Sequence, residues 1–134
     1  MPAALLDTNA VSDLMRDDPK VQARMGIHPD PVLTSVVVVG EIRYGLSRLP
    51  SGKKRRHLEA RAQGVLALLT IEPVTEAIAD VYGRLKATLE SQGLNLDDND
   101  LWIAATAQTL GFLVVSRDKV FSHVPALQAE DWSV

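Results

Sequence analysis

The sequence predicts an α/β domain, spanning residues 1–134, with a central, mainly parallel sheet flanked by helices. Two short runs, Ala3 to Leu6 and Phe112 to Val115, are wholly apolar, which is typical of parallel strands covered on both faces. Segments with helical spacing of apolar residues separate such runs, so strands and helices alternate along the chain. A length of 134 residues suits one domain with its own core.

Composition narrows the classes of function. The hydrophobic fraction is 46%, but no apolar run approaches the ~20 residues of a membrane span and no basic signal-peptide start is present, so we expect a cytoplasmic protein without a membrane role. The absence of cysteine excludes disulfides and thiolate metal sites. A net charge of −3 means that any binding of nucleic acid must depend on local basic patches, and 4% aromatic residues argue against base-stacking platforms.

Turn residues and caps set the expected order of elements. After the first strand, Thr8 or Asn9 is a candidate N-cap for the helix that carries Val11 and Leu14. The elements expected after that helix are a short helix over 20–25, a loop over 28–31, a strand over 32–34, a helix over 36–48, a turn over 50–52, a helix over 53–69, a strand over 71–74, a helix from the N-cap Thr75 to about Gln92, and a last short strand near 128–131.

The valine run just after Ser35 gives conflicting signals. Consecutive valines favour a strand by β propensity. However, Val39, Ile42 and Leu46 recur at spacings of three and four, and Ser35 is a good N-cap. A strand that ends before Ser35, followed by a helix to Arg48, accommodates both signals.

The stretch from Asp100 to Asp118 predicts a helix and a strand that return to one edge. The sequence up to Leu110 is apolar or small on nearly every face, as in a buried helix, and Gly111 stands where a left-handed cap is expected. Such a helix is roughly 16 Å long at ~1.5 Å per residue. A strand from Phe112 runs back about the same distance at ~3.3 Å per residue. Asp118 should therefore lie near the start of the helix at Asp100.

Four acidic residues stand beside apolar segments rather than in polar runs, and we name them the four candidate acids: Asp7, Glu41, Asp100 and Asp118. Ligands of parallel sheets bind at the carboxyl ends of the strands, where Asp7 and Asp118 are expected. A single acid after a strand is often a turn residue or a helix cap. A set of four at such places is harder to explain that way.

Four blocks of sequence cover nearly the whole chain in order: LLDTN at 5–9, VGEIRYG at 39–45, DLWIAA at 100–105 and VVSRD at 114–118. As a set they resemble the PIN-domain nucleases and, more narrowly, the VapC-type toxins of bacterial toxin–antitoxin pairs. The resemblance implies a PIN-like fold, cleavage of RNA with tRNA or rRNA as candidate substrates, dependence on a divalent metal, a VapB-like antitoxin as partner and a homodimer. It also implies that the valine run is helical and that the four candidate acids form the metal site.

The chemistry of the acids supports this interpretation. Clustered carboxylates raise one another's pKa, so a cation is needed to keep them ionised together, and donors that are all oxygen suit Mg²⁺ or Mn²⁺. We assign to Glu41 the role of holding a metal-bound or attacking water during hydrolysis. Thr8, Asn9 and Ser116 are polar neighbours that would position ligands or water. The acids assigned to the metal, directly or through water, are Asp7, Asp100 and Asp118.

The sequence departs from the family pattern near its C-terminal block. Ser116 stands where Thr is common, and the further acid that often precedes the Phe is absent before Phe121, so Asp118 is the only candidate for the fourth acid. Asp97 and Asp98 are additional acids, for which we favour helix caps over a role at the metal. The basic run over 53–56 is interpreted as a solvated helix start, with contact to RNA phosphates as the alternative.

Other functions are weighed against the same residues. A receiver domain would show adjacent acids after the first strand, and a haloacid-dehalogenase-type phosphatase would show D-x-D, whereas Asp7 is followed by Thr8 and Asn9. The strongest alternative is a non-catalytic PIN-fold binding or regulatory protein. Such a protein should have lost some of its acids, and here all four candidate acids are present.

Overall fold

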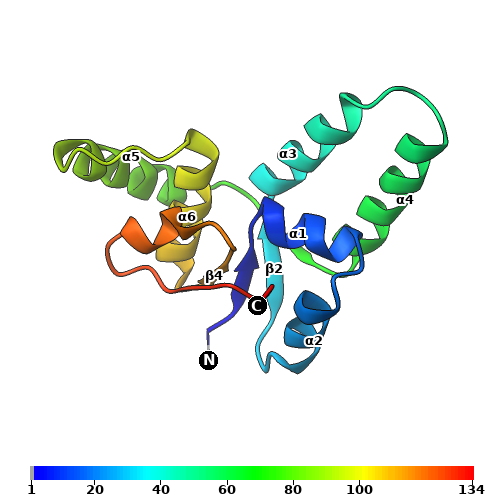
Figure 1. The fold of residues 1–134 in the computed structure, drawn as a ribbon. Coiled ribbons are helices and arrows are strands. Elements are labelled where there is room, and N and C mark those ends of the chain that lie inside the picture. Colours follow the sequence, from blue (N-terminus) through cyan, green and yellow to red (C-terminus); the bar gives the residue numbers. More distant parts are fainter. Residues whose placement is uncertain (1) are drawn as a thin grey trace.

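The computed structural model describes residues 2–134, whose strands form one five-stranded sheet in the order β3-β2-β1-β4-β5 (Figure 1). The strands are β1 (Ala4–Leu6), β2 (Val32–Ser35), β3 (Thr70–Glu72), β4 (Leu113–Val115) and β5 (Ala129–Glu130). Within the described residues, each pair of neighbouring strands is parallel. The predicted α/β fold with a parallel sheet is confirmed.

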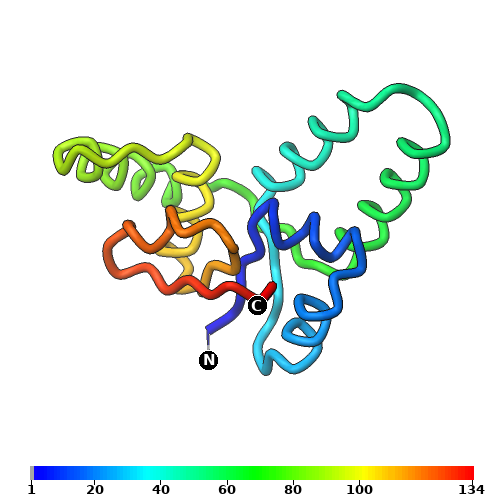
Figure 2. Tube along the Cα trace, viewed as in Figure 1, coloured from blue at the N-terminus to red at the C-terminus, as the bar shows by residue number. Residues whose placement is uncertain are grey.

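Helices flank this sheet on both sides. They are α1 (Thr8–Met15), α2 (Pro19–Ile27), α3 (Val36–Ser47), α4 (Lys53–Ala67), α5 (Glu76–Ser91), α6 (Asp98–Leu110) and the 3-10 helix η1 (Lys119–His123). Figure 2 follows the chain from the α3–α4 hairpin, on one side of the molecule, to the α5–α6 pair on the other. In residues 2–134 no helix combines the length and the apolar character needed to cross a membrane.

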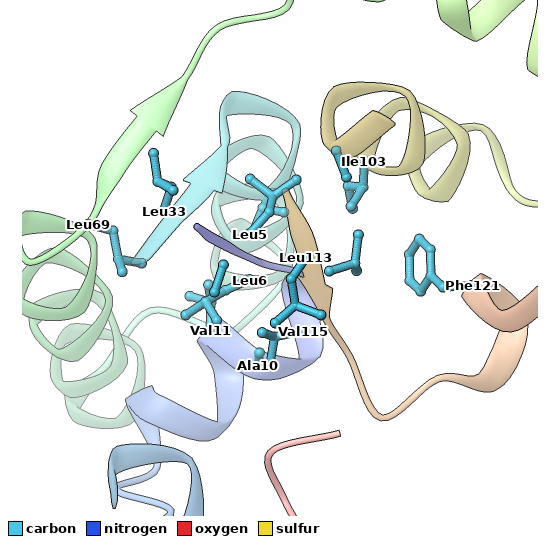
Figure 3. Packing of buried hydrophobic residues seen from close by; sticks show 14 of the residues in the cluster. Leu5, Leu6, Ala10, Val11, Leu33, Leu69, Ile103, Leu113, Val115 and Phe121 are labelled. Atoms are coloured by element: carbon cyan, nitrogen blue, oxygen red, sulfur yellow. The ribbon is translucent and has the colours of Figure 1, made fainter. Parts of the chain in front are cut away.

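The core lies on both faces of β1. Leu5 and Leu6 are 0% exposed. Because successive strand residues point to opposite faces, Leu6 lies towards Val11 of α1, whereas Leu5 lies towards Ile103 of α6 (Figure 3). Burying one such leucine contributes about 1.5–3 kcal/mol, so the uninterrupted apolar run of this strand stabilises contacts with helices on both sides.

Three predicted helix boundaries are confirmed by their caps. The hydroxyl oxygen of Ser35 accepts a hydrogen bond from the N–H of Val37 at 3.0 Å, and the valine run is therefore the first turn of α3. Thr75 caps α5 in the same way through the N–H of Ile78. Gly111 ends α6 with a φ of 73°, in the left-handed region that glycine adopts without strain.

Other predicted caps are wrong or are confirmed only in position. The N-cap of α1 is Asp7, not Thr8 or Asn9, because the helix begins at Thr8, directly after Asp7, and the Asp7 carboxylate accepts from the N–H of Ala10. Asp97 occupies the N-cap position of α6, but its side chain makes no capping hydrogen bond. The carboxylate of Asp98 is engaged elsewhere, since it accepts hydrogen bonds from the Tyr82 hydroxyl at 2.8 Å and from Lys86 Nζ at 3.1 Å on α5.

Candidate active site

The direction of chain progression across the sheet reverses between β1 and β4. From β1 the chain moves outward to β2 and β3, and it then returns to place β4 on the other side of β1. Ligands of open parallel sheets bind at such a switch point, outside the carboxyl ends of the strands. Asp7 follows β1 directly and Asp118 lies just beyond β4, so both stand at this edge.

Asp7 connects β1 to α1. Its N–H donates to the carbonyl of Val115 at 3.1 Å, and its Oδ1 accepts from the N–H of Ala10 at 3.0 Å. The residue is only 4% exposed. Burial raises the pKa of Asp7 to about 6, against hydrogen bonds from the Ser116 side chain and Ala10 that lower it, while the charges of Asp118 and Glu41 raise it further.

Glu41 reaches the same edge from α3. Its Oε1 accepts a hydrogen bond from the hydroxyl of Thr8, the residue after Asp7, at 2.6 Å. This bond ties the first residue of α1 to the middle of α3 and leaves the second carboxylate oxygen of Glu41 for another partner. Thr8 was predicted to position ligands or water, and in the structure its hydroxyl positions the Glu41 carboxylate.

Asp100 is half-buried in the first turn of α6. Burial raises the pKa of Asp100 to about 6, and the negative charges of Asp97, Asp118, Glu41 and Asp7 raise it further. The partial positive charge of the helix N-terminus opposes this effect without cancelling it. Charges act strongly on a neighbour only over short distances. The effect of these charges on the pKa of Asp100 therefore indicates that the four candidate acids lie in one region.

Asp118 lies exposed in the turn after β4. Its N–H donates to the hydroxyl oxygen of Ser116 at 2.9 Å, and its Oδ1 accepts from the N–H of Val120 at 3.0 Å, which caps η1. The Ser116 side chain thus contacts both Asp118 and Asp7. The predicted return of this segment to the start of α6 is supported by the effect of Asp118 on the pKa of Asp100.

The donor set fits a hard divalent cation by its chemistry. Across the described residues 2–134, no three His, Cys, Asp or Glu side chains converge closely enough to hold a metal ion as they stand. Carboxylates of like charge keep one another apart, and a cation would be needed to draw their oxygens to the ~2.1 Å that Mg²⁺ requires. The groups that act most strongly on the pKa values of Asp7 and Asp100 include no cationic side chain, as expected of a site that takes up a cation.

Sequence reasoning missed two features of the site. Asp97 raises the pKa of Asp100 more than any other neighbouring charge does, although it was interpreted as a cap. Asp13 is buried on α1 and accepts a hydrogen bond from Arg117 Nη1 at 2.8 Å. A signal for the second was present, because Asp13 lies three residues after the core residue Ala10 on the same helix, and a carboxylate on a core face needs a partner.

The parallel sheet and the gathered acids define an α/β protein with a carboxylate-lined site at its switch point. The PIN domain profile matches residues 4–127. The chain is 33% identical over 120 residues to VapC ribonuclease Y4jK of Sinorhizobium fredii, covering 85% of this chain and 86% of that protein.

Solved structures show the same similarity in three dimensions. VapBC2 of Rickettsia felis, bound to a DNA fragment from its promoter, has a TM-score of 0.89 at 25% identity, covering 97% of this chain and 98% of that chain. VapBC-5 of Mycobacterium tuberculosis, a member of the VapBC family of toxin–antitoxin systems, has a TM-score of 0.76 at 29% identity and is covered in full, as is this chain. The chain therefore belongs to the PIN-domain family and, within it, to the VapC-type group, as its sequence motifs predicted.

Proposed function

We propose that this chain is an endoribonuclease that depends on Mg²⁺ or Mn²⁺ and that it is the toxin of a type II toxin–antitoxin pair. The observation that carries the proposal is the gathering of four carboxylates at one edge of the sheet, where Asp7 is buried directly after β1 and Glu41 is held by the Thr8 hydroxyl. The raised pKa values of Asp7 and Asp100 agree with this arrangement. The group to which the chain belongs supports RNA as the substrate, since a relative is named a VapC ribonuclease.

Each acid has a distinct part in the proposed hydrolysis. Asp7, Asp100 and Asp118 would hold the cation, which when bound lowers the pKa of a water and stabilises negative charge on the phosphate. Glu41, held by Thr8, would accept a proton from the water that attacks phosphorus in line. One phosphorus–oxygen bond forms, the bond to the leaving oxygen breaks, and that oxygen takes up a proton.

Cleavage of tRNA and rRNA by the purified chain tests this proposal. We expect cleavage with Mg²⁺ or Mn²⁺, and an Asp100→Asn rate lower by about a hundredfold to a thousandfold, as when one electrostatic stabiliser is removed from a site. The matched control is Asp80→Asn, the same change on the exposed side of α5. Cleavage that continues unchanged in excess chelator would rule out the metal-dependent mechanism.

The partner we propose is a VapB-like antitoxin. A groove of about 610 Å³ lies between α1, α2 and α4, and it is lined largely by apolar residues that include Leu14, Met25, Val65 and Leu68. Leu68 is 74% exposed, so an apolar segment of the antitoxin would remove it from water. An antitoxin arginine would pair with the four candidate acids, because its planar fork matches carboxylates.

Co-expression with the adjacent gene tests the partner. We expect the chain alone to arrest growth, the neighbouring gene to relieve the arrest, and the two products to purify together. Leu68→Asp should weaken the complex by about tenfold or more, because it places a charge in the apolar groove, whereas Leu110→Asp, a similar change at an exposed leucine on α6, should not. Equal binding of both variants would contradict this placement.

The chain is further proposed to form a homodimer. Light scattering of the purified chain would then give twice the mass of 14.6 kDa. A mass equal to that of one chain, at micromolar concentrations, would contradict the dimer without affecting the proposed activity.

A further inference from the structure

We infer that the ion pair between Asp13 and Arg117 positions Asp118 in the acidic site. Arg117 directly precedes Asp118 in the turn after β4, and its Nη1 donates to Oδ1 of Asp13 on α1 at 2.8 Å. The inference rests on the proposed function, because it assigns Asp118 to the cation. Arg117 acts through its neighbour and is a positioning residue.

Burial of Asp13 makes this contact strong. The side chain of Asp13 is only 8% exposed, and a carboxylate removed from water is costly unless it is paired. Arg117 supplies the close partner, whereas Arg16 Nη2 lies 3.9 Å from the same oxygen and its side chain is 64% exposed. The buried carboxylate of Asp13 therefore favours the conformation of the exposed turn in which Arg117 stays beside it.

The turn is held on both sides of Arg117. Before it, the N–H of Ser116 donates to the carbonyl of Glu130 at 2.9 Å. After it, the N–H of Asp118 donates to the Ser116 hydroxyl at 2.9 Å. Those bonds shape the turn and tie it to β5, and the Ser116 side chain also contacts Asp7 at the N-cap of α1. Arg117 adds a second connection, to Asp13 further along the same helix.

Helix α1 is the element that Asp7 caps, so the pair connects two of the four candidate acids. Asp7 is the N-cap of α1, and Asp13 lies six residues further along the same helix, about 1.7 turns at 3.6 residues per turn. Through Arg117, Asp118 is held relative to α1, the same helix that has Asp7 as its N-cap. Without Arg117, the Ser116 side chain would still contact both acids, but Asp118 would have more freedom to move relative to Asp7.

The test compares Arg117→Gln with Arg16→Gln in the full chain. Both changes remove one positive charge near Asp13, but only the first removes the contact with the turn. In chelator, hydrogen exchange of the Asp118 amide by NMR should be about tenfold faster in Arg117→Gln and unchanged in Arg16→Gln. With Mn²⁺, calorimetry should show affinity about tenfold weaker for Arg117→Gln only.

Two further variants separate positioning from general stability. Arg117→Lys keeps the charge and should restore part of the Mn²⁺ affinity. The double variant Asp13→Asn with Arg117→Gln should bind Mn²⁺ no more weakly than Arg117→Gln alone, because both changes break the same contact. All measurements are made well below the unfolding temperature of each variant, so a loss of affinity does not reflect unfolding.

The outcomes are distinct. Exchange and Mn²⁺ affinity that match the parent in Arg117→Gln overturn the inference. A rise in the KM for RNA with exchange and affinity unchanged also overturns it and assigns Arg117 to an RNA phosphate. A parent chain that neither binds Mn²⁺ nor cleaves RNA overturns the proposed function and the assignment of Asp118 to the cation, while the exchange measurement still shows separately whether the pair holds the turn.

Discussion

At the scale of single residues, two opposing effects act on the charges of Asp7 and Asp100. Burial and neighbouring carboxylates raise the pKa of each to about 6, yet both stand in helix N-terminal turns, where a negative charge is favoured. The helix termini offset part of the cost of burying these charges. The remaining cost destabilises the metal-free fold at neutral pH, which makes it measurable.

The first prediction concerns that cost and its dependence on pH. A carboxyl whose pKa is raised in the folded protein destabilises it above that pKa, and the penalty disappears below the unfolded value. In chelator at pH 7, Asp100→Asn should therefore be more stable than the parent by ~1–2 kcal/mol, after allowance for partial solvent exposure. Chemical denaturation should show this difference shrinking as pH falls from about 6 towards the unfolded value of 3.8. A difference that is constant with pH would contradict the prediction.

Helix α3 shows, at the scale of elements, how a local cap decides between two structures. Its valine run has strong β propensity, but Ser35 accepts from the N–H of Val37 and starts a helix that buries Val38 and Ile42. The same helix carries Glu41 to the edge of the sheet. The start of α3 is therefore part of the site.

The second prediction compares two caps. Ser35→Ala and Thr75→Ala each remove the side-chain cap of a helix, and each should lower the free energy of unfolding by ~1 kcal/mol. Only Ser35→Ala should also lower kcat, since α3 carries Glu41 and α5 carries none of the four candidate acids. Urea denaturation and RNA cleavage measure the two effects. Equal losses of kcat would mean that α3 has no special role.

Sequence reasoning succeeded where local signals agreed with the tertiary structure. The start of α3 and the glycine end of α6 depend on residues next to each other in the chain, and both were predicted. Asp7 was missed as a cap because α1 starts at Thr8 with no loop after the strand, and a shift of one residue in the start of a helix changes which side chain caps it. Asp98 was wrongly predicted as a helix cap because its partners, Tyr82 and Lys86, lie on another helix. No local sequence pattern predicts such a contact.

At the scale of the whole molecule, the topology of the sheet determines where the four candidate acids lie. Parallel order and the reversal between β1 and β4 bring Asp7 and Asp118 to one edge, and α3 and α6 bring Glu41 and Asp100 to it. This could be inferred from the alternation of strands and helices. The distances among the acids could not, because they depend on side-chain contacts such as the bond from Thr8 to Glu41.

Charge is distributed unevenly over the molecule. The basic run at the start of α4 lies in the α3–α4 hairpin, which projects away from the sheet (Figure 1). Within this run, Arg55 pairs with Glu59 at 2.8 Å, while Lys53, Lys54 and Arg56 are exposed. The solvated helix start is therefore the simpler interpretation, and contact of these residues with RNA stays a prediction.

Thermal unfolding with and without Mn²⁺ tests most directly whether the four candidate acids form a metal site. The proteins are the parent, Asp100→Asn and the control Asp80→Asn, at neutral pH. In chelator we expect Asp100→Asn to unfold at a higher temperature than the parent, because one repelling charge is removed. In excess Mn²⁺ the order should invert, since binding at about 100 times Kd stabilises the intact site by ~2.7 kcal/mol. The control should follow the parent in both conditions. An Asp100→Asn variant that is less stable than the parent in chelator and responds equally to Mn²⁺ would contradict a metal site at these acids.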